Sequence, residues 1–260
     1  MKVDYQQPKA VRWVYRGMKR IIILFTLVLP LYAFGQDTLR VGYEFRDFSR
    51  LEMGTKRDLV YTEINGRLLS MTIKSRTTER VQLGGKKYIS ISHSWTGTDT
   101  KMNGSFSYLC EPVTLKPVQH IRQTTQKGKE AYLFSQQEIT GLDTATNNSA
   151  AEFKLTLNTP TYNWEIDLET YSLLPMRTNY TAVMNFYHPG SSTPPDYYTL
   201  KVVGSEKLRL PDGRQLDCWI LFTDYGGTQP SHFWYTKKGQ NFVKMEGKYN
   251  QLTIRKERIF

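Results

Sequence analysis

The chain has 260 residues, of which 39% are hydrophobic and 13% aromatic, and its formal net charge is +11. This apolar content is enough for a sizeable core, so the composition excludes an intrinsically disordered chain. The length is ordinary for one large all-β domain.

Residues 1–35 have the pattern of a secretory signal peptide. A basic stretch precedes a short apolar run, residues 21–31, and the small residues Ala33 and Gly35 precede a cleavage site. The apolar run is far shorter than the ~20 residues of a membrane-spanning helix, and no cysteine follows it, which disfavours a lipid-anchored lipoprotein. We therefore expect export to the periplasm or to the extracellular side of the envelope. Met18 is an alternative true start of this leader.

Alternation of apolar and polar residues dominates the rest of the chain and is typical of strands with one buried face. The clearest apolar sets are Leu39, Val41, Tyr43 and Phe45, then Leu69, Met71 and Ile73, then Ile89, Ile91, His93 and Trp95. Turn residues separate these runs, and Asn65-Gly66 suits a two-residue hairpin. We expect an all-β fold of about a dozen strands, a curved antiparallel sheet or an open or closed barrel of successive hairpins with little helix.

Two polar segments, 141–151 and 188–195, read as exposed loops because they are rich in small residues and prolines. Neither is long enough to mark a domain boundary. We therefore expect residues 36–260 to form a single domain.

A short phrase of Ser or Thr, Leu, a variable residue and Pro occurs at 114–117 and again at 172–175. In each copy an aromatic residue precedes the phrase and an apolar residue follows it, and residues 232–249 hold a looser third copy. Since proline cannot donate to a strand ladder, we interpret the phrase as a repeated hairpin corner with Pro at a strand start. Chance remains the alternative for so short a match.

Cys110 and Cys218 are the only two cysteines. Both lie beyond the leader, so a disulfide is possible and could stabilise the fold by about 4 kcal/mol. Alternatively, each is a small apolar residue in a strand, because spacing alone cannot show bridging geometry.

Basic residues are concentrated late in the chain. Removal of the leader takes away six basic residues and one acidic residue, which leaves a net charge of +6. Between residues 237 and 258, seven basic residues face only Glu246 and Glu257. This run suits a face that meets anionic lipid, glycan or an acidic partner protein, and the alternative is a solvated strand face.

Three phrases in the second half of the chain carry a resemblance to a known family: LETYSLLPMR, VVGSEKLRLPDGRQLDCWILFTD and HFWYTKKGQNFVKMEG. They resemble the envelope family of domain of unknown function 3108, and more distantly the LolA/LolB superfamily of periplasmic lipoprotein carriers. The resemblance implies a curved antiparallel sheet or open barrel in the cell envelope and implies no reaction. Carriers of that superfamily cover the sheet with helices, whereas this sequence shows no convincing helix.

Motifs of catalysis and metal binding are absent from the sequence: it has no G-x-S-x-G, H-E-x-x-H or Cys-x-x-Cys. The four histidines are isolated, and His93 and His120 are expected along strands as satisfied polar residues. We predict no enzyme, cofactor, metal or nucleic-acid partner.

Glu165, Asp167 and Glu169 form the densest acidic group, and their spacing predicts one face of a strand. They could bind Ca²⁺ or act as the acid and base of a glycan hydrolase. The simpler interpretation makes them the wet face of a strand whose buried face holds Trp164, Ile166 and Leu168.

Aromatic residues are the most suggestive feature for binding. We predict that Trp164, Trp219, Trp234, Phe233 and Tyr198 contact an apolar or lipid-like ligand, with the three tryptophans on the concave side of the sheet. The same residues could equally fill a core. The predicted function is that of an exported, non-enzymatic envelope protein that binds a lipid, a lipoprotein or another apolar ligand. The alternative is a structural or assembly factor that acts through protein contacts.

Overall fold

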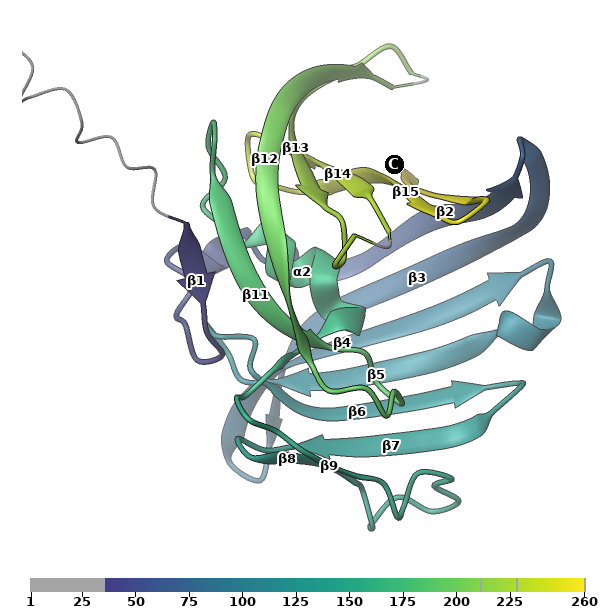
Figure 1. The fold of residues 1–260 in the computed structure, drawn as a ribbon, viewed down its shortest axis with the longest axis vertical. Coiled ribbons are helices and arrows are strands. Elements are labelled where there is room, and N and C mark those ends of the chain that lie inside the picture. Colours follow the sequence, from purple (N-terminus) through teal and green to yellow (C-terminus); the bar gives the residue numbers. More distant parts are fainter. Residues whose placement is uncertain (1–35, 211, 228, 260) are drawn as a thin grey trace, which may run out of the picture. The chain divides into compact units, whose positions relative to one another are not determined.

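A computed structural model describes residues 36–210, 212–227 and 229–259. The described residues form one large, open, mostly antiparallel sheet of 16 strands with one short α-helix, so the predicted all-β class is confirmed (Figure 1). The signal-peptide prediction falls on residues 1–35, which lie outside the described residues. Within the described part of the chain, no helix is long and apolar enough to span a membrane.

The strands are β1 (Asp37–Leu39), β2 (Gly54–Ile64), β3 (Arg67–Leu83), β4 (Lys86–Gly97), β5 (Gly104–Cys110), β6 (Pro117–Thr124), β7 (Gly128–Phe134), β8 (Glu138–Gly141), β9 (Lys154–Thr156), β10 (Tyr162–Asn163), β11 (Thr181–Tyr187), β12 (Asp196–Arg209), β13 (Gln215–Thr223), β14 (Ser231–Thr236), β15 (Phe242–Tyr249) and β16 (Leu252–Ile259). The helices are α2 (Asp167–Ser172) and the 3-10 turns η1 (Phe48–Arg50), η2 (Thr100–Met102) and η3 (Trp164–Ile166).

Two runs of hairpins make the sheet. The strands β2 to β9 pair in chain order, the strands β11 to β16 do the same, and β16 pairs with β2 to join the runs. At the far side of β11, β1 and β10 pair with it in parallel. In Figure 1, α2 lies between the β3–β6 part of the first run and the β11–β14 part of the second. We call the face that packs against α2 the inner face.

Strand alternation and turn chemistry account for the regular part of the sheet. Ile91 pairs with Tyr108 and Tyr108 with His120, so these three side chains share the inner face. At the β2–β3 turn, Asn65 and Gly66 both adopt positive φ (49° and 78°), which is the conformation that a two-residue hairpin needs. The predicted turn is therefore confirmed.

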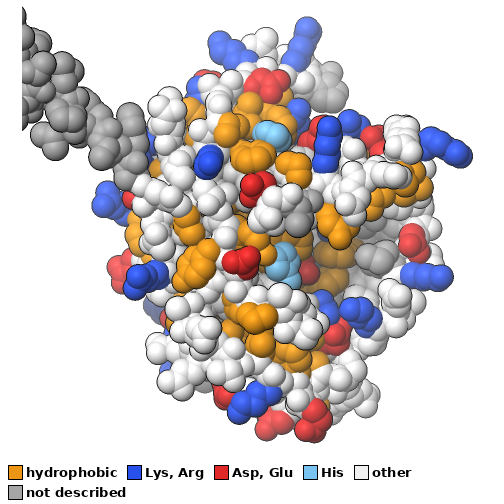
Figure 2. Space-filling model, in the orientation of Figure 1, with side chains coloured by type: hydrophobic (Ala, Val, Ile, Leu, Met, Phe, Trp, Pro, Cys, Tyr) orange, Lys and Arg blue, Asp and Glu red, His pale blue; other side chains and the backbone are white. Residues whose placement is uncertain are grey.

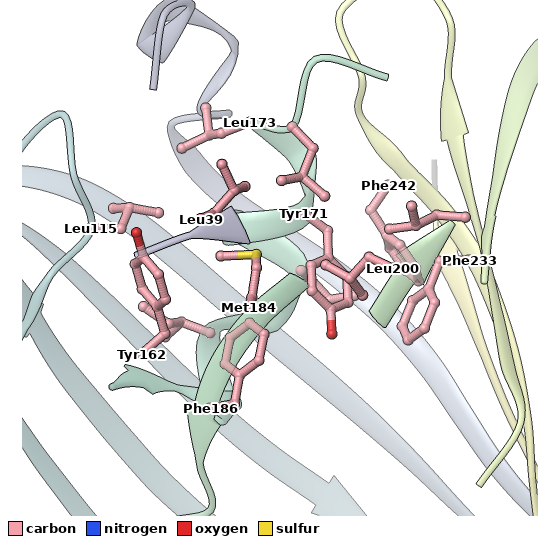
Figure 3. Packing of buried hydrophobic residues seen from close by; sticks show 14 of the residues in the cluster. Leu39, Leu115, Tyr162, Tyr171, Leu173, Met184, Phe186, Leu200, Phe233 and Phe242 are labelled. Atoms are coloured by element: carbon pink, nitrogen blue, oxygen red, sulfur yellow. The ribbon is translucent and has the colours of Figure 1, made fainter. Parts of the chain in front are cut away.

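The core lies where α2 meets the inner face (Figure 3). Tyr171 of α2 packs edge-on against Phe233 of β14 and Phe186 of β11, with ring centroids 5.4 and 6.0 Å apart. A smaller cluster around Tyr132 and Tyr187 lies beside β7 to β9. Burial of these large rings stabilises the sheet around the helix, at roughly 25 cal/mol for each Å² of apolar surface removed from water.

The helix α2 corrects the sequence prediction of a strand at 164–169. Asn163 caps η3 by accepting from the backbone N–H of Glu165, and two acidic residues stand in the first turn of α2, where the helix dipole favours negative charge. At the other end, the Gln240 side-chain amide donates to the carbonyls of Ser172 (2.9 Å) and Leu174 (2.6 Å). These long-range contacts complete a helix that its own length of six residues could not stabilise.

The repeated phrase is a hairpin corner in only two of its three copies. Pro117 opens β6 after the β5–β6 connection, and the third copy spans the β14–β15 hairpin, as predicted. The second copy is wrong, because residues 172–175 form the end of α2 and the coil that follows it. Segments 141–151 and 188–195 are mainly turns and coil.

Candidate functional site

The inner face carries an unusual number of ionisable side chains. Cross-strand pairing brings Lys74, Asp58 and Trp95 to one level of the sheet, and Lys56, Arg76 and His93 to the next. The acidic residues of η3 and α2 face the same region, as the mutual electrostatic influence of Glu165, Asp167 and Lys74 indicates. The sheet and the helix therefore enclose a polar cluster beside the aromatic core.

Part of this cluster consists of direct ion pairs. Glu169 accepts from two nitrogens of Arg76, one of them at 3.2 Å, and the two side chains are only 7% and 5% exposed. Burial alone would raise the pKa of Glu169, but the adjacent Arg76 guanidinium outweighs it and lowers that pKa. A second pair joins Arg258 to the fully buried Asp58 at 3.0 Å. The first pair fastens α2 to the inner face, and the second joins the neighbouring strands β16 and β2 on that face.

Other charges in the cluster have no ion pair among the described residues. Burial, reinforced by the charge of Lys256, lowers the pKa of Lys74 to about 7, against the opposing pull of Glu165. Burial likewise raises the pKa of Glu165 and of Asp167. Buried ionisable groups with strongly shifted pKa values are found more often at functional sites than elsewhere.

A row of aromatic and imidazole rings crosses the inner face next to these charges. Tyr108 lies between His93 and His120, with ring centroids 4.8 and 4.7 Å away. Burial lowers the pKa of His120 to about 3, so its ring is neutral. Neither ring nitrogen of His120, nor Nε2 of His93, has a hydrogen-bond partner among the described residues. Both histidines lie on strands, as predicted, but they are not fully satisfied.

A pocket of about 260 Å³ opens beside this cluster, at the ends of β4, β5 and β6. Trp95 and Phe106 form its apolar wall, with ring centroids 4.3 Å apart. The Lys74 ammonium lies 3.5 Å from the centre of the Trp95 ring. The remaining lining residues are polar or charged: Lys101, Arg122, Thr124, Gln126, Lys127 and Glu165.

Positive charge exceeds negative charge around this pocket. Arg122 binds Glu130 through two nitrogens, at 2.7 and 2.8 Å, so these two charges offset each other. Lys101 and Lys127 are exposed at the mouth, whereas Glu165 is the acidic residue of the lining. An anionic group would therefore find net favourable charge here, next to an aromatic surface.

The predicted ligand-contacting aromatics are placed on two different faces. Phe233 is fully buried and Tyr198 is 9% exposed, both in the core, and Trp164 and Trp219 pack against that core. Trp234 pairs with Ile220 on the outer face, where its Nε1 donates to Glu206 at 2.8 Å. The prediction that Trp234 lines the concave side is therefore wrong, because it alternates with the buried Phe233.

The acidic group is also rearranged relative to the prediction. Asp167 and Glu169 are buried, not on a wet face, and Glu165 alone of the three lines the pocket. Within residues 36–259 as described, no group of three His, Cys, Asp or Glu side chains is arranged to hold a metal ion. A glycosidase needs two carboxyl groups that flank its substrate, and this arrangement presents one.

Cys110 and Cys218 are both free and buried, so the disulfide that the sequence left open is not formed. Cys110 lies on β5 and Cys218 on β13, in different halves of the sheet. Burial raises the pKa of both thiols, that of Cys218 to about 11, which makes them unreactive.

The late basic run does not form one cationic surface. Arg258 is buried against Asp58, and Lys256 on the same inner face has its pKa lowered by burial. On the outer face, Arg255 is paired with Glu246 and with Glu63. Alternation along β16 divides the run between the two faces of the sheet.

A comparison with known protein families decides the relationship of the chain. The family model described as "Protein of unknown function (DUF3108)" matches residues 60–255. The chain belongs to this family. No curated protein and no solved structure matches it. In this DUF3108 member, the matched region, residues 60–255, includes every residue that lines the pocket. The more distant relation to lipoprotein carriers is not shown.

Proposed function

We propose that this chain is an exported, non-enzymatic binding protein of the cell envelope, and that its pocket takes a small amphiphile with a negative charge or the corresponding end of a larger lipid. The observation that carries the proposal is that one cavity of about 260 Å³ combines an aromatic wall with two exposed lysines, Lys101 and Lys127, at its mouth. Export is supported by the leader pattern of residues 1–35.

The apolar part of the ligand would pack on Trp95 and Phe106. This contact would use the faces of the two rings, whose centroids lie 4.3 Å apart. The anionic group would lie toward Lys101 and Lys127, which are free to move into contact because both are exposed. Lys74 lies behind the Trp95 ring, outside the lining, and with its pKa lowered to about 7 it would add only part of a positive charge at neutral pH.

The size of the ligand is limited by the helix. Leu168 and Tyr171 of α2 occupy the concave face between the two hairpin runs and pack into the core. A long lipid groove lined by Trp164 and Trp219, as the sequence suggested, would need that space. We therefore place the ligand in the pocket beside α2, where it reaches the ends of β4 to β6.

Two fluorescent probes with the same kind of aromatic body test this proposal. We expect 1-anilinonaphthalene-8-sulfonate, which is anionic, to bind the purified chain at one saturable site and more tightly than the neutral N-phenyl-1-naphthylamine. Replacement of Trp95 by Ala should abolish the site, because it removes the apolar wall. The double change Lys101→Gln and Lys127→Gln should weaken only the anionic probe.

The matched control is Trp234→Ala, which removes a tryptophan from the outer face and should leave probe binding intact. Equal affinity for the two probes would reject an anionic ligand. Unchanged binding in the Trp95→Ala variant would reject the pocket and favour the alternative of an assembly factor that acts through protein contacts.

A further inference from the structure

Four neighbouring hairpin ends beside the pocket carry exposed cationic and apolar side chains. The β2–β3 end carries Arg67, Leu68 and Leu69, and the two leucines are 55% and 56% exposed. The β15–β16 end carries Tyr249, which is 47% exposed, next to the exposed Lys248. The β4–β5 and β6–β7 ends carry the two lysines of the pocket mouth. We call these four ends the docking rim.

Backbone pairing makes the docking rim continuous. Leu252 after the β15–β16 turn pairs with Ile64 before the β2–β3 turn. The next contact joins β3 to the β4–β5 connection, where the Thr98 N–H donates to the Met71 carbonyl at 2.9 Å. Gly104 of β5 then pairs with Thr124 at the β6–β7 end. These hairpins end on the right of Figure 1, and on the same side of Figure 2 blue and orange side chains lie close together, with a few red ones among them.

The charge of the docking rim is net positive. Among its acidic neighbours, Glu63 is already paired with Arg255 at 2.9 Å, and Asp99 accepts from the backbone N–H of Lys101. Asp99 keeps its negative charge in that hydrogen bond, but the four exposed cations Arg67, Lys101, Lys127 and Lys248 outnumber it, so the docking rim is net positive beside its exposed leucines. Monomeric proteins rarely leave such apolar groups together without an interaction partner.

We infer that the docking rim binds the surface of an anionic lipid bilayer. Leucine side chains that enter the headgroup region, a tyrosine at that level and lysine or arginine beside them are the features by which peripheral proteins bind anionic membranes. The pocket mouth shares two lysines with the docking rim, so in a docked chain the mouth of the pocket would face the lipid. This inference goes beyond the proposed ligand, because bilayer binding is measured independently of the pocket.

Vesicle co-sedimentation of the full chain tests the inference. We expect it to sediment with vesicles of equal parts phosphatidylcholine and phosphatidylglycerol, to sediment much less with pure phosphatidylcholine, and to be released by salt. The double change Leu68→Ser and Leu69→Ser should reduce binding by about tenfold or more. Arg67→Gln should reduce it by about fivefold. None of these residues lines the pocket, so binding of 1-anilinonaphthalene-8-sulfonate should persist in each variant.

The opposite end of β3 provides a matched control, because the β3–β4 turn also exposes a leucine and lysines. The double change Leu83→Ser and Lys86→Gln should leave vesicle binding unchanged. Equal losses in the two double variants would overturn the docking rim as the site. Equal binding to vesicles with and without phosphatidylglycerol would reject an anionic bilayer as the partner. Self-association that requires Leu68 and Leu69, without vesicle binding, would assign the surface to a second copy of the chain.

Discussion

Loss of the Glu169 carboxylate should destabilise the fold by about 3 kcal/mol. In Glu169→Gln, the Arg76 guanidinium remains buried, at 5% side-chain exposure, without its main counter-charge. Removal of one partner of a buried pair typically costs about 3–5 kcal/mol. We expect the lower end, because Asp58 and Asp167 also stabilise the charged form of Arg76. The gap in stability, which is the difference in free energy of unfolding between the parent chain and Glu169→Gln, is measured by urea denaturation followed by tryptophan fluorescence.

The pH dependence of that gap follows from the lowered pKa of Glu169. A carboxylate whose pKa is lower in the folded state stabilises the fold above its unfolded pKa, near the ordinary value of 4.5. That stabilisation is lost as the pH falls through the folded pKa. The gap between the parent and Glu169→Gln should therefore be full at neutral pH and should shrink in acid.

Two controls separate this effect from a general loss of charge. The exposed pair Lys154–Glu138 has side chains 67% and 39% exposed, so Glu138→Gln should cost less than about 0.5 kcal/mol. Replacing both Arg76 and Glu169 by Met should recover much of the loss, because neither member of this pair then remains as an unmatched buried charge. A Glu169→Gln variant within about 0.5 kcal/mol of the parent, or a gap that grows in acid, would refute the reasoning.

Three further predictions concern the buried Lys74, the Gln240 side chain and the two cysteines. Because the pKa of Lys74 is lowered to about 7 in the folded state, its protonation opposes folding below the ordinary value of 10.5. Lys74→Met should therefore gain stability in urea titrations at pH 7, and the gain should shrink as the pH rises toward 10.5. Gln240→Leu leaves the carbonyls of Ser172, at the end of α2, and of Leu174 without their donor, and should cost about 1–3 kcal/mol, measured in the same way. Without reductant, iodoacetamide should add one label to each of Cys110 and Cys218 in the unfolded chain and no label in the folded chain, as read by intact mass. An unfolded chain that takes up no label because the two cysteines are bridged would contradict this.

The regular part of the sheet could be predicted from local sequence. Ile89 and Ile91 alternate with serines, and this alternation alone fixes a strand with one buried face. The helix α2 could not be predicted in the same way, since six residues give too short a window for helical periodicity. Its alternating acids imitate a strand, and the residues that hold it, Arg76 and Gln240, are distant in the sequence.

The pocket was not predictable because it depends on which strands become neighbours. Trp95, Arg122 and Glu165 come from two strands and a 3-10 turn. The sequence marks Lys74 only as one polar position in a long alternating strand, and it does not show whether that face meets water or α2. The same uncertainty of face explains the error at Trp234, which is one residue from the buried Phe233. A shift of one residue reverses the face of every side chain in a strand.

Native mass spectrometry of the chain purified from the cells that produce it naturally tests the central claim most directly. We predict a species with one additional bound mass that organic solvent releases and that carries an acidic group. The same preparation of the Trp95→Ala variant should lack it, and that of Trp234→Ala should retain it. An unliganded mass for the parent chain, unchanged after incubation with acidic lipids of the envelope, would contradict the account.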